Sequence, residues 1–67
     1  MSANELSLVE KVARELVNRD GAGALRLARD RAELDEKLGD LRSATVWRYI
    51  ADEIEYLQAG PATRDAE

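Results

Sequence analysis

The sequence predicts an all-α fold, a small antiparallel three-helix bundle with short connections. Apolar residues recur at helical spacing in three consecutive stretches of the 67-residue chain. Helix-ending signals separate the stretches and close the last one: Gly21, Gly39 and the pair Gly60-Pro61. Very short links between helices favour antiparallel neighbours, so three helices of this kind predict a bundle.

The predicted helices cover residues 3–20, 22–38 and 41–58. They belong to one domain, residues 1–59, because together they account for nearly the whole of it. The polar residues 60–67 are expected to form a flexible tail.

The first two helices differ in the width of their apolar faces. The first has one compact face made by Leu6, Val9, Val12, Ala13, Leu16 and Val17. The second has a wide arc, whose two edges hold Leu27, Leu34 and Leu38 on one side and Leu25, Ala28 and Ala32 on the other. A wide arc predicts contact with two neighbours at once.

The third helix begins after Asp40, a residue type favoured as an N-cap, and carries every aromatic residue of the chain. Its main apolar face consists of Val46, Trp47, Ile50, Ile54 and Leu57. Tyr49 and Tyr56 form a separate stripe about a third of a turn away.

The composition excludes most kinds of chemistry. The chain has no His and no Cys, so the usual general base, the commonest metal ligands and disulfides are all missing. We therefore expect no enzymatic activity, no catalytic residues, no cofactor and no metal. No apolar run approaches membrane-spanning length, so we expect no membrane partner and a cytoplasmic location. A core of this size is marginal, which favours self-association, with a homodimer as one candidate.

Seven residues are candidates for protein interaction: Trp47, Tyr49, Tyr56, Arg31, Asp35, Leu27 and Leu34. Trp47 is either a core residue or a partner anchor, since tryptophan is frequent in both places. The two tyrosines either flank the core or form a binding strip. Arg31 and Asp35 lie at the centre of the wide arc. There they either mark a solvated strip or form a partly buried ion pair at an oligomer interface.

One stretch, Arg31–Ile50, resembles the helix-turn-helix families related to phage repressors. The resemblance rests on Ala32, Glu33, Leu34, Leu38 and Gly39, followed by Ser43, Thr45, Val46, Tyr49 and Ile50. It implies that residues from about Arg42 to Arg48 would face the major groove of DNA. The sequence departs from that pattern at Asp35 and Asp40, which stand where the motif has a small and an apolar residue.

A second resemblance spans roughly residues 24–58. The chain is similar there to a loose group of short, uncharacterised helical proteins of Gram-negative bacteria. The shared positions are Ala28, Ala32, Gly39, Asp40, Ala44, Trp47, Ile50 and Ala51. This resemblance implies a helical hairpin and no particular activity.

The charge balance decides between the functional hypotheses. The formal net charge is −4, whereas a DNA-binding face needs a basic footprint. We therefore predict a small non-enzymatic interaction or regulatory module with an unknown protein partner. It is expected to self-associate through its second and third helices, and nucleic acid is not expected as a partner. A divergent helix-turn-helix regulator is the alternative.

Overall fold

The computed structural model describes residues 3–59, and nearly all of them are helical. Helix α1 spans Ala3–Asp20, a short 3-10 helix η1 spans Gly21–Gly23, α2 spans Ala24–Lys37, and α3 spans Leu41–Ala59. Because η1 joins α1 to α2 without a break, the described chain forms two uninterrupted helical stretches, residues 3–37 and 41–59. The prediction of an all-α fold is confirmed.

The helix boundaries differ slightly from the predicted ones. The second helix starts at Ala24, because the preceding residues form η1, and it ends at Lys37. The third helix runs one residue further than predicted, to Ala59. The predicted tail, residues 60–67, lies outside the described residues.

The corner between α1 and α2 depends on Gly21. Its φ of 55° lies in the left-handed region, where a residue with a Cβ is strained. The amide Nε2 of Gln58, at the end of α3, donates a 2.7 Å hydrogen bond to the carbonyl oxygen of Gly21. The corner is thereby tied to the far end of the third helix.

The turn between α2 and α3 is a Schellman motif built around Gly39, which has a φ of 82°. The Asp40 backbone N–H donates to the Asp35 carbonyl at 2.8 Å, and the Gly39 N–H donates to the Glu36 carbonyl at 3.0 Å. Asp40 then caps α3, because its Oδ1 accepts a 3.1 Å bond from the backbone N–H of Ser43. The turn therefore satisfies backbone groups at both helix ends and reverses the chain within three residues.

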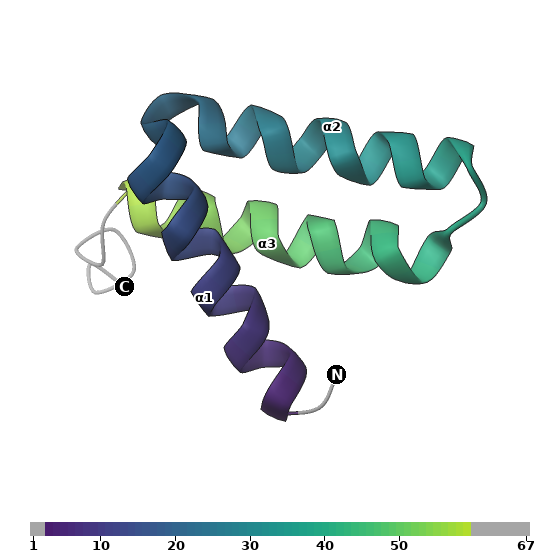
Figure 1. Cartoon of the computed structure of the whole chain (residues 1–67), viewed down its shortest axis with the longest axis horizontal. Coiled ribbons are helices and arrows are strands. Elements are labelled where there is room, and N and C mark those ends of the chain that lie inside the picture. The colour runs from purple at the N-terminus through teal and green to yellow at the C-terminus, as the bar shows by residue number, and fades with distance from the viewer. Residues whose placement is uncertain (1–2, 60–67) are drawn as a thin grey trace.

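Helices α2 and α3 lie side by side in opposite directions, whereas α1 slants across α3 and diverges from α2 (Figure 1). The main core lies where all three meet and consists of Val9, Ala13, Ala24, Ala28, Ile50, Ala51 and Ile54. Since α2 contributes only its first residues to this core, α1 leaves the turn half of α2 uncovered.

The core is unusual in the size of its side chains. Six of the nine buried apolar residues among those described are alanines, and Ile54 is the largest fully buried side chain. Alanine permits close approach of two helices, which explains the tight α2–α3 pairing. It also contributes little buried area, so the free energy gained by burial is small.

Candidate protein-interaction surface

Two leucines of α2 and the two leucines that flank the turn lie on the surface, whereas Leu25 of α2 packs against the core. Leu27 is 40% exposed, Leu34 47%, Leu38 72% and Leu41 67%. Periodicity placed Leu27, Leu34 and Leu38 at the edge of an apolar arc, and the structure shows that the alanines of that arc face α3. These leucines consequently keep a large part of their surface exposed in the described chain, and they make a candidate surface for protein contact.

Arg31 and Trp47 come together at the centre of this surface. The Arg31 guanidinium lies over the Trp47 ring, with its carbon Cζ 5.5 Å from the ring centroid, which is a cation–π arrangement. Trp47 is partly buried and packs against the main core, while Arg31 is exposed. Trp47 therefore contacts both the core and Arg31 of the candidate surface, and whether it serves as a partner anchor stays a prediction.

Asp35 has a different partner from the one that its position on α2 suggested. It is buried, with 8% of its surface exposed, and its Oδ2 accepts a 2.6 Å hydrogen bond from the Ser43 hydroxyl. None of the ion pairs among the described residues joins Arg31 to Asp35. Spacing along α2 placed the two residues together, but the third helix supplies a separate partner to each. Asp35 thus fastens the start of α3 to the end of α2.

Replacing Asp35 by alanine should lower the free energy of unfolding by about 1–3 kcal/mol, because the Ser43 hydroxyl loses a charged acceptor in a partly buried place. Asp35→Asn is the matched control, since an amide oxygen can still accept that hydrogen bond. Urea unfolding followed by circular dichroism would measure both. Equal losses in the two variants would contradict a role through this hydrogen bond.

The two tyrosines differ in exposure. Tyr49 is 47% exposed, whereas Tyr56 is partly buried near the end of α3. The structure therefore offers Tyr49 to a partner more fully than Tyr56. Their contribution to binding stays a prediction.

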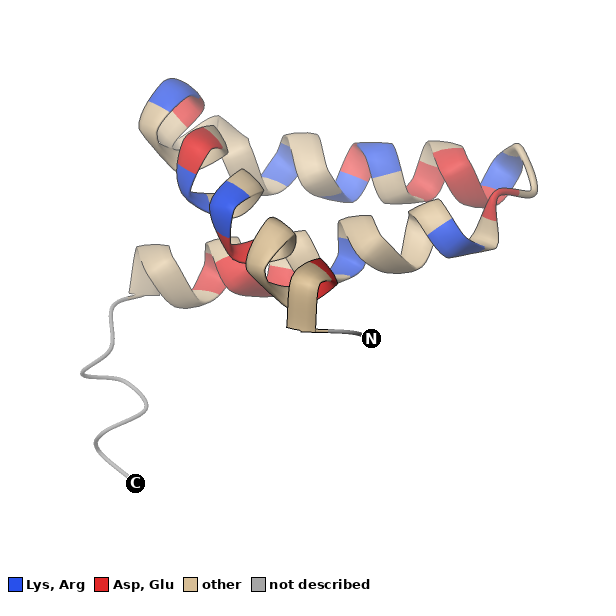
Figure 2. Cartoon of the chain, turned by 60° about the horizontal axis from the view of Figure 1, so that its bottom comes forward, with Lys and Arg blue, Asp and Glu red and all other residues tan. Residues whose placement is uncertain are grey.

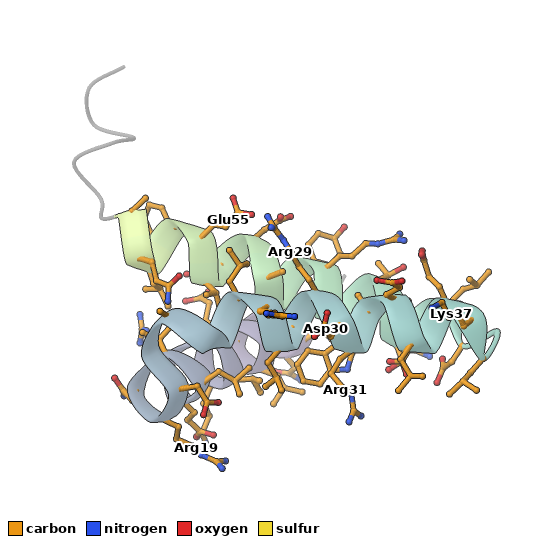
Figure 3. The ribbon with its side chains drawn as sticks, turned by 90° about the horizontal axis from the view of Figure 1, so that it is seen from above. Arg19, Arg29, Asp30, Arg31, Lys37 and Glu55 are labelled. Atoms are coloured by element: carbon orange, nitrogen blue, oxygen red, sulfur yellow. The ribbon has the colours of Figure 1, made fainter. Side chains whose placement is uncertain are left out.

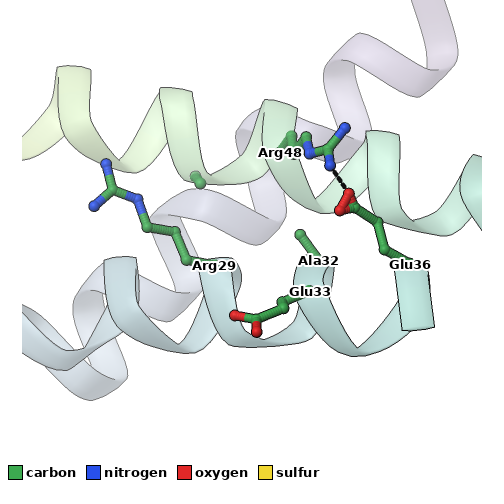
Figure 4. A pocket seen from close by; sticks show the side chains of 6 residues that line it. Arg29, Ala32, Glu33, Glu36 and Arg48 are labelled. Carbon is green, nitrogen blue, oxygen red and sulfur yellow. Dashed lines mark hydrogen bonds and ion pairs between the residues drawn. The ribbon is translucent and has the colours of Figure 1, made fainter. Parts of the chain in front are cut away.

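A shallow groove of about 270 Å³ lies on the other side of the hairpin, with Ala32 and Ala51 in its lining (Figure 4). Its charged lining residues are Arg29, Glu33, Glu36 and Arg48. Arg48 is paired with Glu36, and Arg29 with Glu55. Both guanidinium groups already have carboxylate partners, and Glu33 is paired with Lys37, so each charged side chain that lines the groove has a partner of opposite charge. It is also open and small for a ligand site.

The described residues contain no cluster of three or more metal-ligating side chains. None of the described helices is long and apolar enough to cross a membrane. The chain matches no protein-family model, no curated protein and no solved structure at a significant level.

Three parts of the candidate surface were missed by the sequence interpretation. Leu38 was assigned to an apolar edge but not to the surface, Leu41 was not singled out, and Ser43 was named only for the helix-turn-helix resemblance. For Leu38 the signal was available, because it continues the four-and-three spacing that begins at Leu27. For Ser43 there was none, since its contact with Asp35 depends on how α3 folds back.

Proposed function

We propose that this chain is a small, non-enzymatic interaction module that associates with itself through α2 and α3. The observation that carries the proposal is the inverted distribution of side-chain size. Six of the nine buried apolar residues are alanines, while Leu27, Leu34, Leu38 and Leu41 are exposed within the described chain. Covering such leucines with a second protein surface gains the burial that the chain alone lacks.

In this proposal the three helices act as one bundle. Val9 and Ala13 of α1 belong to the same buried cluster as Ile50 and Ile54 of α3, which supports treating α1 as the third member of the bundle. The cytoplasm is the proposed compartment, as expected from the sequence. The absence of His and Cys from the sequence supports a binding function over a catalytic one.

Self-association is expected to depend on Leu34. Replacing Leu34 by glutamine should raise the dissociation constant by about tenfold or more, because each copy loses the burial of a leucine side chain in the interface. A loss of about 1.4 kcal/mol corresponds to a factor of ten in the dissociation constant. Sedimentation velocity across a concentration series would measure the change. Leu8→Gln is the matched control, since Leu8 is 57% exposed but lies on α1.

Two outcomes would contradict this proposal. A wild-type chain that stays monomeric at high micromolar concentration would remove self-association. Dissociation caused by Leu8→Gln and not by Leu34→Gln would move the contact surface from α2 to α1. Circular dichroism melts of both variants are needed as a control, and normal melts would show that the changed residues act on association rather than on folding.

A helix-turn-helix regulator remains the alternative, and the geometry favours it less. Helices of that motif cross at about 90–120°, whereas α2 and α3 lie antiparallel (Figure 1). Arg42 and Arg48, which would face DNA, pair with Glu5 and Glu36. The second half of α3 carries only acidic charges (Figure 2). Salt-sensitive, sequence-selective binding of duplex DNA at physiological ionic strength would favour the alternative.

A further inference from the structure

Four residues of α2 form a continuous strip that we call the α2 seam: Leu27, Arg31, Leu34 and Leu38. They are spaced by four, three and four residues, which is the spacing of the contact positions in a two-helix coiled coil. All four are exposed in the described chain. The seam lies on the side of α2 that carries Arg31, opposite the side that carries Arg29 (Figure 3). Its spacing and exposure are therefore suited to packing against a second helix.

The two flanks of the seam differ in charge. On the outer flank, seven residues apart, stand Asp30 and Lys37, whose side chains are 69% and 71% exposed. On the inner flank stand Ala28 and Asp35, which are buried against the chain's own third helix and turn. Only Asp30 and Lys37 are therefore placed to meet the flank of a docked helix, and their charges are opposite.

We propose that a second copy of this chain docks on the α2 seam, with the two α2 helices antiparallel and the symmetry axis passing between Ala32 and Glu33. This inference rests on the proposed self-association and adds its geometry. In that arrangement Leu27 packs beside the partner's Leu38, and Arg31 beside the partner's Leu34. Asp30 then meets the partner's Lys37, and the symmetry forms this ion pair twice.

The charges select this alignment over its neighbours. Sliding one helix by seven residues keeps the seam in contact but brings either Asp30 opposite the partner's Asp30 or Lys37 opposite the partner's Lys37. Both contacts are repulsive. A parallel, in-register pairing would place Arg31 against the partner's Arg31 in the middle of the seam, which is also unfavourable. In the antiparallel, centred alignment both flanking contacts are attractive, and each Arg31 packs beside a leucine instead of directly opposite the other Arg31, with its charge held over its own Trp47 ring.

Arg31 fits the centre of this interface because its charge is already accommodated. Its guanidinium lies over the Trp47 ring of its own chain, so the methylene stem can pack in the seam while the charge stays on the aromatic face. The existing contacts of the flanking charges do not prevent new ones. Asp30 lies 3.9 Å from Arg26, and Lys37 lies 3.3 Å from Glu33, in exposed pairs within the same helix. Such pairs contribute little and can share their charges with a partner.

Charge reversal tests the alignment directly. Asp30→Lys and Lys37→Asp, made separately, each turn both attractive contacts of the symmetric dimer into repulsive ones. We expect each variant alone to associate at least about tenfold more weakly than the wild type. The difference should shrink at about 1 M salt, where the Debye length is about 3 Å.

An equimolar mixture of the two variants should associate as tightly as the wild type, because every contact in the mixed dimer is again attractive. The double variant should likewise recover.

Asp52→Lys is the matched control for Asp30→Lys, because it changes the net charge of the chain by the same amount at an exposed position of α3. Sedimentation velocity on the full chain, with circular dichroism to check folding, gives all the comparisons. Two results would overturn the α2 alignment but not self-association. One is association that requires Leu34 but is unchanged by the charge reversals, and the other is a mixture that does not recover wild-type association. A wild-type chain that stays monomeric would overturn both, and the seam would then belong to a different protein partner.

Discussion

Replacing Ile54 by alanine is expected to lower the free energy of unfolding by about 3–5 kcal/mol and leave the chain largely unfolded at room temperature. Ile54 is 0% exposed and is the largest fully buried side chain among the described residues. A core of this size contributes no more than about 3–5 kcal/mol of net stability, so the loss is comparable with the whole.

The neighbours of Ile54 explain why the effect should fall at the upper end of the usual range. The buried cluster around it includes Ala13, Ala24, Ala28 and Ala51, whose side chains have no rotamers that can move into a cavity. At these alanines, relaxation would require movement of whole helices, and the corner at Gly21 and the Schellman turn at Gly39 restrict such movement. The cavity left by Ile54→Ala therefore stays largely open, and its cost adds to the lost burial.

Ile54→Val provides the matched control, with an expected loss of about 0.5–1.5 kcal/mol. Far-UV circular dichroism without denaturant measures how much of the Ile54→Ala chain is folded, and urea unfolding compares Ile54→Val with the wild type. Protein concentration must be held constant, because association stabilises the folded state by mass action. An Ile54→Ala protein that unfolds within about 1 kcal/mol of the wild type would show that stability resides mainly in the contact between copies.

The sequence was sufficient to predict those features that depend on local chemistry. Glycine ends helices because it reaches the left-handed region at little cost, and both Gly21 and Gly39 do so. Asp40 caps the next helix through its own side chain, as its residue type predicted. These features involve residues within a few positions of one another, so spacing alone determines them.

Features that depend on packing between helices could not be predicted from the sequence in this way. Periodicity identifies a face of one helix but not the element that covers it. The arc of α2 contained alanines and leucines, and close packing against α3 selected the alanines for the interior. Similarly, Arg31 and Asp35 share a face of α2, yet they do not pair with each other. Arg31 lies over the ring of Trp47, and Asp35 accepts a hydrogen bond from Ser43. The slant of α1 depends on the corner geometry, for which no sequence signal was available.

Replacing Trp47 by alanine is expected to lower the free energy of unfolding by about 2–3 kcal/mol, less than for a fully buried tryptophan, because the ring is only partly buried. Tyr49→Ala is the matched control on the same helix, with an expected change within about 0.5 kcal/mol, since Tyr49 is 47% exposed. Trp47→Phe should recover part of the loss, because a smaller aromatic ring still offers a face to the Arg31 guanidinium.

The two interpretations of Trp47 differ in what the alanine variant does to association. If the ring serves only the core, the variant is less stable, but its dissociation constant, measured under conditions where it is folded, stays near that of the wild type. If the ring also supports the α2 seam, its loss frees the Arg31 guanidinium from the aromatic face and leaves a charge in the middle of the interface. Association is then weakened beyond the loss of stability.

Arg31→Met, which removes the charge but keeps a long apolar stem, should restore association in the Trp47→Ala background. Failure of that rescue would separate Trp47 from the interface and leave it a core residue.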